Sequence, residues 1–349
     1  MSHNGPRPRR PRSAAVAVVA AVLGILATEL VLGWPALTGA LAQLRTPHPG
    51  WLLAAVGAAL ASMRAYASMQ GRLLRAAGVR VPMVRQLALA YAAHSLSVTL
   101  PGGPAFSTGL NYRQMRRFGA SPAVTSWCIA LSGLLSAAAL AVITAAGAFT
   151  AHGTPRWPAL AVLAAAVALA TAGVRRLART PDALAPALAL VNRVRRRPPG
   201  HGADRVVEFL GQLRATRLTP AHATAAAGYA LLNWLLDAAC LWLCLHAVAG
   251  GVGAGRLLLA YCAGMAAGTV TIVPAGLGII DGALVLGLTT AGAATSAAVA
   301  GVVLYRLVSF GFIIAIGWLA LLLIRRREST KDGPLHRSAH SGEQRPAVP

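Results

Sequence analysis

The sequence has little charge, few acidic residues and a single lysine. Only 12% of its 349 residues are charged, and 9 acidic residues stand against 32 basic ones. Soluble domains usually carry about twice that share of charge, and the mean hydropathy here is +0.61, so a water-soluble fold is excluded. The formal net charge of +23 raises the question of nucleic acid. Several apolar runs long enough to cross a bilayer indicate a membrane protein instead, and we expect no nucleic-acid partner.

Cysteine is scarce as well, and its placement argues against a disulfide framework or a zinc site. All four cysteines sit in apolar runs, without the additional His or Cys partners that zinc needs. They are Cys128, Cys240, Cys244 and Cys262. We expect them to be packing residues, and we expect no metal and no cofactor. The sequence also lacks a G-x-S-x-G elbow and a phosphate-binding P-loop, so covalent catalysis is not the expected function.

Six apolar segments are long enough to be spanning helices, which need about 20 residues. The first follows the basic tail 1–13, as the core of a secretory signal would. It is too long for such a core, so we expect it to remain in the mature protein. The six segments are residues 14–34, 51–70, 122–150, 158–174, 221–248 and 295–324.

Two further apolar regions are interrupted by proline and glycine. Residues 86–118 are broken at the tip Pro101, Gly102, Gly103 and Pro104, and residues 256–292 at the tip containing Pro274, Gly276 and Gly278. Proline removes a backbone donor and glycine adds conformational freedom, so both sites should interrupt a helix. The arm before the first break reaches only about 22 Å, which is short for a crossing. We expect two re-entrant hairpins; two kinked spanning helices are the alternative.

The arginines predict the orientation. Basic stretches occur at 1–13, 72–85, 113–117, 175–220 and 325–327, whereas residues 35–50, 151–157, 249–255 and 292–295 are nearly uncharged. By the positive-inside rule the basic stretches are cytoplasmic. We therefore expect a multi-pass plasma-membrane protein with both termini in the cytoplasm. The two hairpins must then enter the membrane from opposite sides.

These observations predict an all-α polytopic membrane protein containing an inverted repeat. The integral membrane domain covers residues 14–325, its halves are 51–150 and 221–325, and a basic cytoplasmic linker at 175–220 joins them. The polar tail 326–349 is expected to be disordered. Broken helices at matching positions in two halves are typical of transporters that bind substrate near the membrane midplane.

Three ionisable residues inside apolar segments are the main candidates for a binding site, because a charge within the membrane is costly. They are Arg306, Asp281 and Asp237. The second arm of each hairpin begins at its tip, and a helix N-terminus favours phosphate. We expect Arg306 to bind a lipid phosphate and to alternate between it and Asp281 or Asp237. The alternative is a fixed Arg306–Asp281 ion pair that only orients the hairpin.

Four other polar residues are candidates for contacts with a lipid headgroup. Arg113 is placed to line a cytoplasmic entrance, and Asn111 and Tyr112 are placed to meet headgroup oxygens. His94 lies in the first hairpin arm. Because no carboxylate stands at a spacing that would orient its imidazole, we expect a packing role for His94, with proton transfer as the alternative.

The two interrupted regions resemble the two signatures of the lysylphosphatidylglycerol synthase transmembrane-region family. The first signature is T-L-P-G-G-P-A-F-S-T-G-L-N-Y-R at 99–113 with R-R-F-G at 116–119, and the second is V-P-A-G-L-G-I-I-D at 273–281 with L-Y-R at 304–306. The resemblance implies a membrane domain that moves aminoacylated phospholipid between leaflets. The cytosolic transferase of the multiple-peptide-resistance factors has no counterpart in the tail 326–349, so synthase activity is not implied.

We therefore predict a protein that binds and translocates an anionic or aminoacylated phospholipid. One alternative is an intramembrane enzyme acting on a polyprenyl phosphate, since opposed hairpins also suit a lipid-phosphate hydrolase. Against it, no carboxylate cluster stands near Ser97 or His94 to serve as a base. Another alternative is an accessory membrane subunit of a separately encoded lipid-modifying or glycosyl-transferring enzyme.

Overall fold

The computed structural model describes residues 47–100, 102–152, 218–248, 250–268 and 278–332, together with Ala42, Leu44 and Arg45. Within these residues all secondary-structure elements are helices. The expected spans 14–34 and 158–174 lie outside the described residues. So do the tail 1–13, nearly all of the linker 175–220, and the tip residues Pro101, Pro274 and Gly276.

Four helices in the described residues are long and apolar enough to cross a membrane. They are α2 (Pro49–Ala76), α5 (Pro122–His152), α9 (Pro220–Ala247) and a continuous helix over Thr295–Arg326. They coincide with four of the six predicted spans, which confirms an all-α, polytopic membrane-type protein. The last helix continues to Asp332, past residue 325, where we expected the membrane domain to end.

Local sequence explains where the long helices start and stop. In α9, the Thr219 side chain accepts a hydrogen bond from the backbone of His222, and Pro220 occupies the first turn. Both features are typical of helix N-termini. After α2 the chain turns at Gly78, whose φ of 81° is a left-handed conformation that favours glycine.

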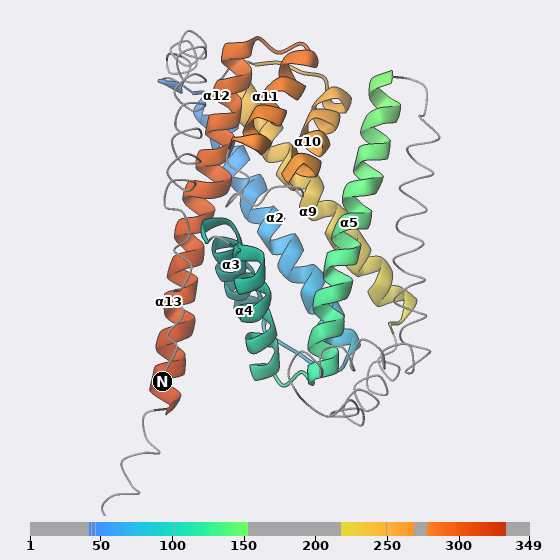
Figure 1. Ribbon diagram of the computed structural model, residues 1–349, viewed down its shortest axis with the longest axis vertical. Coiled ribbons are helices and arrows are strands. Elements are labelled where there is room, and N and C mark those ends of the chain that lie inside the picture. Colours follow the sequence, from blue (N-terminus) through green and yellow to red (C-terminus); the bar gives the residue numbers. More distant parts are fainter. Residues whose placement is uncertain are drawn as a thin grey trace, which may run out of the picture.

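The predicted hairpins are pairs of short helices packed against each other. The first pair is α3 (Met83–Thr99) and α4 (Gly103–Arg117), and the second is α10 (Ala254–Gly268) and α11 (Ile279–Thr290). Gly102 turns the first tip with a φ of 69°, and a Cβ on Gly103 would collide with the backbone oxygens of Leu96 and Ser97. Figure 1 shows α3 and α4 in the lower half of the bundle and α10 and α11 in the upper half. The two pairs therefore enter the bundle from opposite ends.

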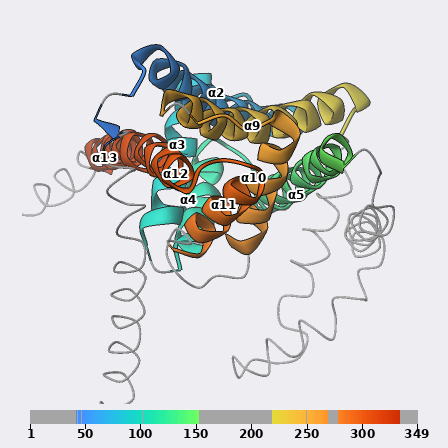
Figure 2. The same ribbon diagram turned by 90° about the horizontal axis from the view of Figure 1, so that it is seen from above.

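The first helices of the two halves, α2 and α9, lie side by side and antiparallel (Figures 1 and 2). Near one end of the pair, Trp51 meets Trp242 edge-on with ring centroids 5.9 Å apart. Farther along, the Ser62 hydroxyl lies 3.1 Å from the backbone oxygen of Asn233. This arrangement places corresponding elements of the two halves in opposite directions, as an inverted repeat requires.

The last helix of each half crosses the first hairpin arm of the other half. Helix α13 (Ile313–Asp332) packs on α3, and α5 packs on α10. Glycine occupies both crossings. A Cβ on Gly317 of α13 would collide with Ser95 and with the backbone oxygen of Tyr91, and a Cβ on Gly147 of α5 would lie 3.1 Å from the Cβ of Leu258. Small residues of this kind allow helices in a membrane to approach closely.

The last helix is not regular, contrary to the uninterrupted helix expected at 295–324. After α12 (Thr295–Arg306), residues Leu307–Phe312 form a π-helical segment, η3, before α13 begins. A π-turn widens the helix and rotates the side chains that follow it, and such segments are frequent at functional sites. Here it begins directly after Arg306, and the Ser309 hydroxyl inside it donates to the Tyr305 backbone oxygen at 2.7 Å.

Candidate functional site

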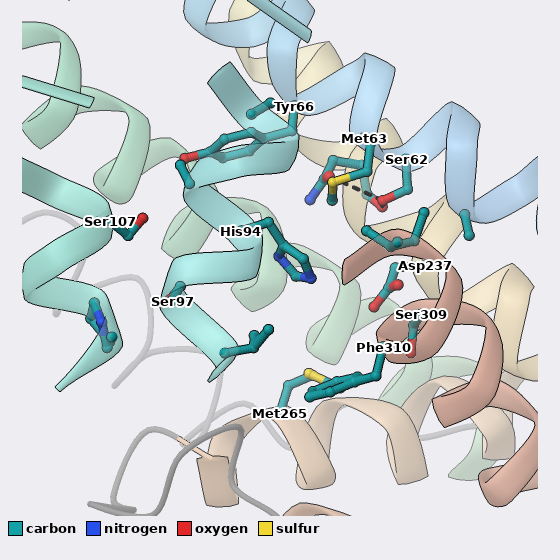
Figure 3. Close-up of a pocket in the computed structure, with 18 of the residues that line it drawn as sticks. Ser62, Met63, Tyr66, His94, Ser97, Ser107, Asp237, Met265, Ser309 and Phe310 are labelled. Carbon is teal, nitrogen blue, oxygen red and sulfur yellow. Dashed lines mark hydrogen bonds between the residues drawn. The ribbon is translucent and has the colours of Figure 1, made fainter. Parts of the chain in front are cut away.

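A cavity of about 750 Å³ lies where the two halves meet. The tip of the first hairpin forms part of its wall through Gly102, Gly103 and Pro104, and Ile280 at the start of α11 contributes from the second hairpin. Figure 3 shows the polar side chains that point into it from α2, α3, α4, α9 and η3. The polar and charged residues of its wall are Ser62, Tyr66, His94, Ser97, Ser107, Ser136, Asn233, Asp237, Tyr305, Arg306 and Ser309.

Arg306 is the only arginine or lysine among the described residues that line this cavity. Its Nε donates to Asp281 Oδ1, and the backbone N–H of Gly278 donates to Asp281 Oδ2 at 3.1 Å. Asp281 thus both caps the N-terminus of α11 and binds Arg306. The guanidinium carbon also lies 4.4 Å from the centre of the Phe310 ring, a cation–π contact. The ion pair that we expected as one of two arrangements is therefore present.

The guanidinium of Arg306 is not fully used by these contacts. Its Nη2 atom is buried and has no hydrogen-bond partner among the described residues. The side chain is 14% exposed. Since an unsatisfied donor in an apolar surrounding is costly, this nitrogen is available for an acceptor that enters the cavity.

Asp237 is held by two tyrosines from different helices. The hydroxyl of Tyr261 on α10 donates to Asp237 Oδ2 at 2.5 Å, and the hydroxyl of Tyr305 on α12 donates to the same oxygen at 2.9 Å. Both tyrosines are buried. Sequence reasoning missed them, because each lies in an apolar run where a tyrosine is an ordinary packing residue. Their only signal is that a buried phenol needs a hydrogen-bond partner.

His94 lies in the same cavity, and a carboxylate lies near it. We expected no carboxylate cluster near His94 or Ser97, and one carboxylate, that of Asp237, lies close enough to His94 for their charges to interact. In Figure 3 the His94 ring points toward the side of the cavity where Asp237 lies. Spacing along the chain could not predict this neighbour, because Asp237 comes from the other half of the chain.

The comparison with protein families agrees with this architecture. The model of the family "Lysylphosphatidylglycerol synthase TM region" matches residues 13–317. The chain belongs to this family. Members of this lysylphosphatidylglycerol synthase transmembrane-region family are membrane proteins related to lipid handling. The match confirms the resemblance found in the two signatures. The matched range includes both hairpins and every residue that lines the cavity. No curated protein matches the chain.

In this lysylphosphatidylglycerol synthase transmembrane-region protein, three predicted headgroup contacts lie away from the cavity. Arg113 and Tyr112 are exposed on α4. Asn111 is buried, and its side-chain oxygen has no hydrogen-bond partner among the described residues. None of the three lines the cavity. The structure therefore separates these residues from Arg306, Asp237 and His94.

Two further observations concern the cysteine thiols and possible metal ligands. All four cysteines are buried free thiols within the core. In the part of the chain that the structure describes, no group of three His, Cys, Asp or Glu side chains is arranged to hold a metal ion.

Proposed function

We propose that this protein binds an anionic or aminoacylated phospholipid and translocates it between the leaflets of the plasma membrane. The observation that carries the proposal is the unpartnered Nη2 of Arg306 at a cavity between two inverted halves. A guanidinium donates several N–H groups in a planar fork that suits phosphate. Asp281 occupies Nε, which leaves the other end of that fork for a headgroup.

The size and lining of the cavity support a lipid ligand. Its volume of about 750 Å³ lies within the usual range for ligand pockets, about 300–1,000 Å³. The polar residues provide hydrogen bonds for a headgroup, while Met63, Met265 and Phe310 provide apolar wall for the adjoining chains. Figure 3 shows Met265 and Phe310 side by side at one edge of the cavity.

The arrangement of the halves supports translocation. Each last helix packs on the first hairpin arm of the opposite half, so a shift of one half against the other changes both hairpins together. Transporters with inverted repeats expose a central site to alternate sides by such motions. Because the tip of the first hairpin lines the cavity, its displacement would open one route to the site.

The distribution of arginine supports the proposed orientation. In Figure 1 the ends of α2, α4 and α13 lie together at the lower end of the bundle. These ends carry Arg75, Arg116 and Arg325. The connections at 248–253 and 291–294, at the upper end, contain no charged residue. By the positive-inside rule we propose that the lower end, where α13 ends, faces the cytoplasm.

A flipping assay with purified protein tests the proposal. The full chain is reconstituted in vesicles that contain fluorescent phosphatidylglycerol, and a membrane-impermeant quencher reports the lipid that reaches the outer leaflet. We expect the wild-type protein to accelerate this exchange and Arg306→Ala to reduce the rate by about tenfold or more, since a charge-assisted phosphate contact is lost. Arg256→Ala is the matched control, because Arg256 lies at the start of α10, does not line the cavity, and donates a hydrogen bond to the Ala291 backbone oxygen at 3.4 Å.

Folding of both variants is checked by size-exclusion chromatography and thermal unfolding, and copurifying lipid is identified by mass spectrometry. A folded Arg306→Ala protein that exchanges lipid at the wild-type rate would contradict the proposal.

A separately encoded lipid-modifying enzyme is the partner that we propose to supply the lipid.

The second candidate is a lipid-phosphate hydrolase, and one observation favours it. His94, Asp237 and Ser97 share the cavity, so a histidine and a carboxylate stand together there. Such a pair is a feature of general acid–base catalysis. Release of phosphate from a polyprenyl diphosphate by wild-type protein, with loss in His94→Gln, would assign this activity.

A further inference from the structure

We infer that the cavity takes up one proton at the Asp237–His94 pair together with each anionic headgroup that it binds. The inference rests on the proposed function, because it concerns how the same site accepts a lipid. It follows from the balance of charges around the cavity and from the contacts of Asp237.

The described residues at the cavity leave an excess of negative charge. Arginine stays protonated in proteins, so Arg306 is positive. Two carboxylates interact with this one guanidinium. Asp281 accepts a hydrogen bond from its Nε, and Asp237 lies close enough for its charge to interact with it. With His94 neutral, two carboxylates therefore face one cation. A phosphodiester headgroup would add a further negative charge in a region of low dielectric, where repulsion is strong.

The other described groups that face Asp237 and His94 do not remove this excess. Tyr261, Tyr305 and Tyr66 are neutral phenols and Cys240 is a neutral thiol; they come from α10, α12, α2 and α9. Helices α4 and α13 contribute no charged side chain to the described cavity wall. Residues 269–277, between α10 and α11, contain no ionisable side chain. Protonation of Asp237 or His94 is thus the change that neutralises the site.

The hydrogen bonds of Asp237 permit reversible protonation of its carboxylate. Both tyrosine hydroxyls converge on Oδ2, and no donor from the described residues reaches Oδ1. Oδ1 is therefore free to carry a proton without displacing either tyrosine. His94 is directed toward the same part of the cavity (Figure 3). Two interacting groups titrate as a pair, so we assign the proton to the pair and not to one residue.

Linkage then determines the sign of the pH dependence. A protonated site repels a phosphodiester less, so the affinity for an anionic lipid is highest at low pH and falls as the pH rises through the titration of the pair. For one coupled proton, the steepest part of this dependence is about tenfold in affinity per pH unit. The phosphodiester of phosphatidylglycerol does not titrate between pH 5 and 8, so a slope in this range belongs to the protein.

Calorimetric titration of the full chain in nanodiscs tests the inference. Phosphatidylglycerol is added between pH 5 and 8 in two buffers that differ in ionisation enthalpy, which gives the affinity and the number of protons taken up. For the wild type we expect an affinity that falls as the pH rises and an uptake that approaches one proton per lipid. The lysyl ester of the same lipid has two amino groups that are both protonated at pH 5 to 6, so in that range we expect it to bind without proton uptake.

Substitutions at Asp237 and His94 test where the proton binds. Asp237→Asn removes the excess charge but keeps an acceptor for the tyrosines, so we expect a weaker pH dependence and an affinity at pH 8 that exceeds the wild-type affinity. His94→Gln should move the pH range of the change. His222→Gln is the matched control, since His222 lies at the start of α9 beside Thr219 and should leave the slope unchanged.

Two results would overturn the inference. One is wild-type binding of phosphatidylglycerol with no pH dependence and no proton uptake. The other is an equal proton uptake with phosphatidylglycerol and its lysyl ester. Both comparisons use wild-type protein, so they stand even if a variant fails to fold. A wild-type protein that binds neither lipid at any pH would instead contradict the proposed function.

Discussion

Arg306 and Asp237 each place a charge inside an apolar bundle, and each has its own set of partners. Arg306 has Asp281 and the ring of Phe310, and Asp237 has two tyrosine hydroxyls. A charge in such a place is expensive, which is why the sequence was sufficient to select these residues as candidates. The sequence offered Arg306–Asp281 as one of two arrangements, but it did not find the two tyrosines, which lie 24 and 68 residues from Asp237 along the chain.

At the residue scale, Tyr305→Phe should destabilise the protein. The hydroxyl of Tyr305 is one of two donors to Asp237, and the side chain is 3% exposed. Its removal leaves a buried carboxylate with one donor fewer, at a cost of about 1–3 kcal/mol. Thermal unfolding of the detergent-solubilised protein measures the loss. If the hydrogen bond is the cause, combining Tyr305→Phe with Asp237→Asn should cost less than the sum of the single changes; strictly additive costs would rule that cause out.

At the scale of elements, the helix breaks were predictable and the irregular helix was not. Proline and glycine act locally, so the tip at Gly102–Gly103 could be found from the sequence, and the structure breaks the helix there. Nothing in L-V-S-F-G-F at 307–312 requires a π-helix. The segment lies between Arg306, which binds Asp281, and α13, which packs on α3.

The crossing of α13 and α3 gives a prediction for one helix pair. A Cβ on Gly317 would meet Ser95 and the backbone of Tyr91, so Gly317→Ala should cost about 1–3 kcal/mol as the helices are forced apart. Gly57 on α2 is the matched control, since a Cβ there meets nothing within 4 Å. Gly57→Ala should be neutral or stabilising by up to about 1 kcal/mol. Equal melting temperatures for the two variants would refute the tight crossing.

At the scale of the whole molecule, the orientation in the membrane is open to a direct test. All four native cysteines are buried, so they should contribute little labelling by a membrane-impermeant thiol reagent. Arg80 and Gly251 are exposed, in the connections after α2 and after α9. We expect Gly251→Cys to be labelled in intact cells and Arg80→Cys only after the membrane is opened. Labelling of both from the same side would contradict an inverted repeat.

The sequence by itself determined the class of the protein, the positions of four long helices and of the first hairpin break, and the expected direction of each hairpin. Hydropathy, proline, glycine and arginine act through local properties or through the nearest membrane surface, so no tertiary contact is needed to interpret them. The family also followed from short motifs within single segments, and the match over residues 13–317 agrees.

Only the tertiary structure decided which candidates share a site. It joined Asp237 to Tyr261, Tyr305 and His94, and it left Asn111, Tyr112 and Arg113 outside the cavity. The physical reason is that α2 and α9 pack antiparallel and each last helix crosses to the other half. Residues from distant parts of the chain therefore meet at one point in the bundle, and their spacing along the chain could not predict this.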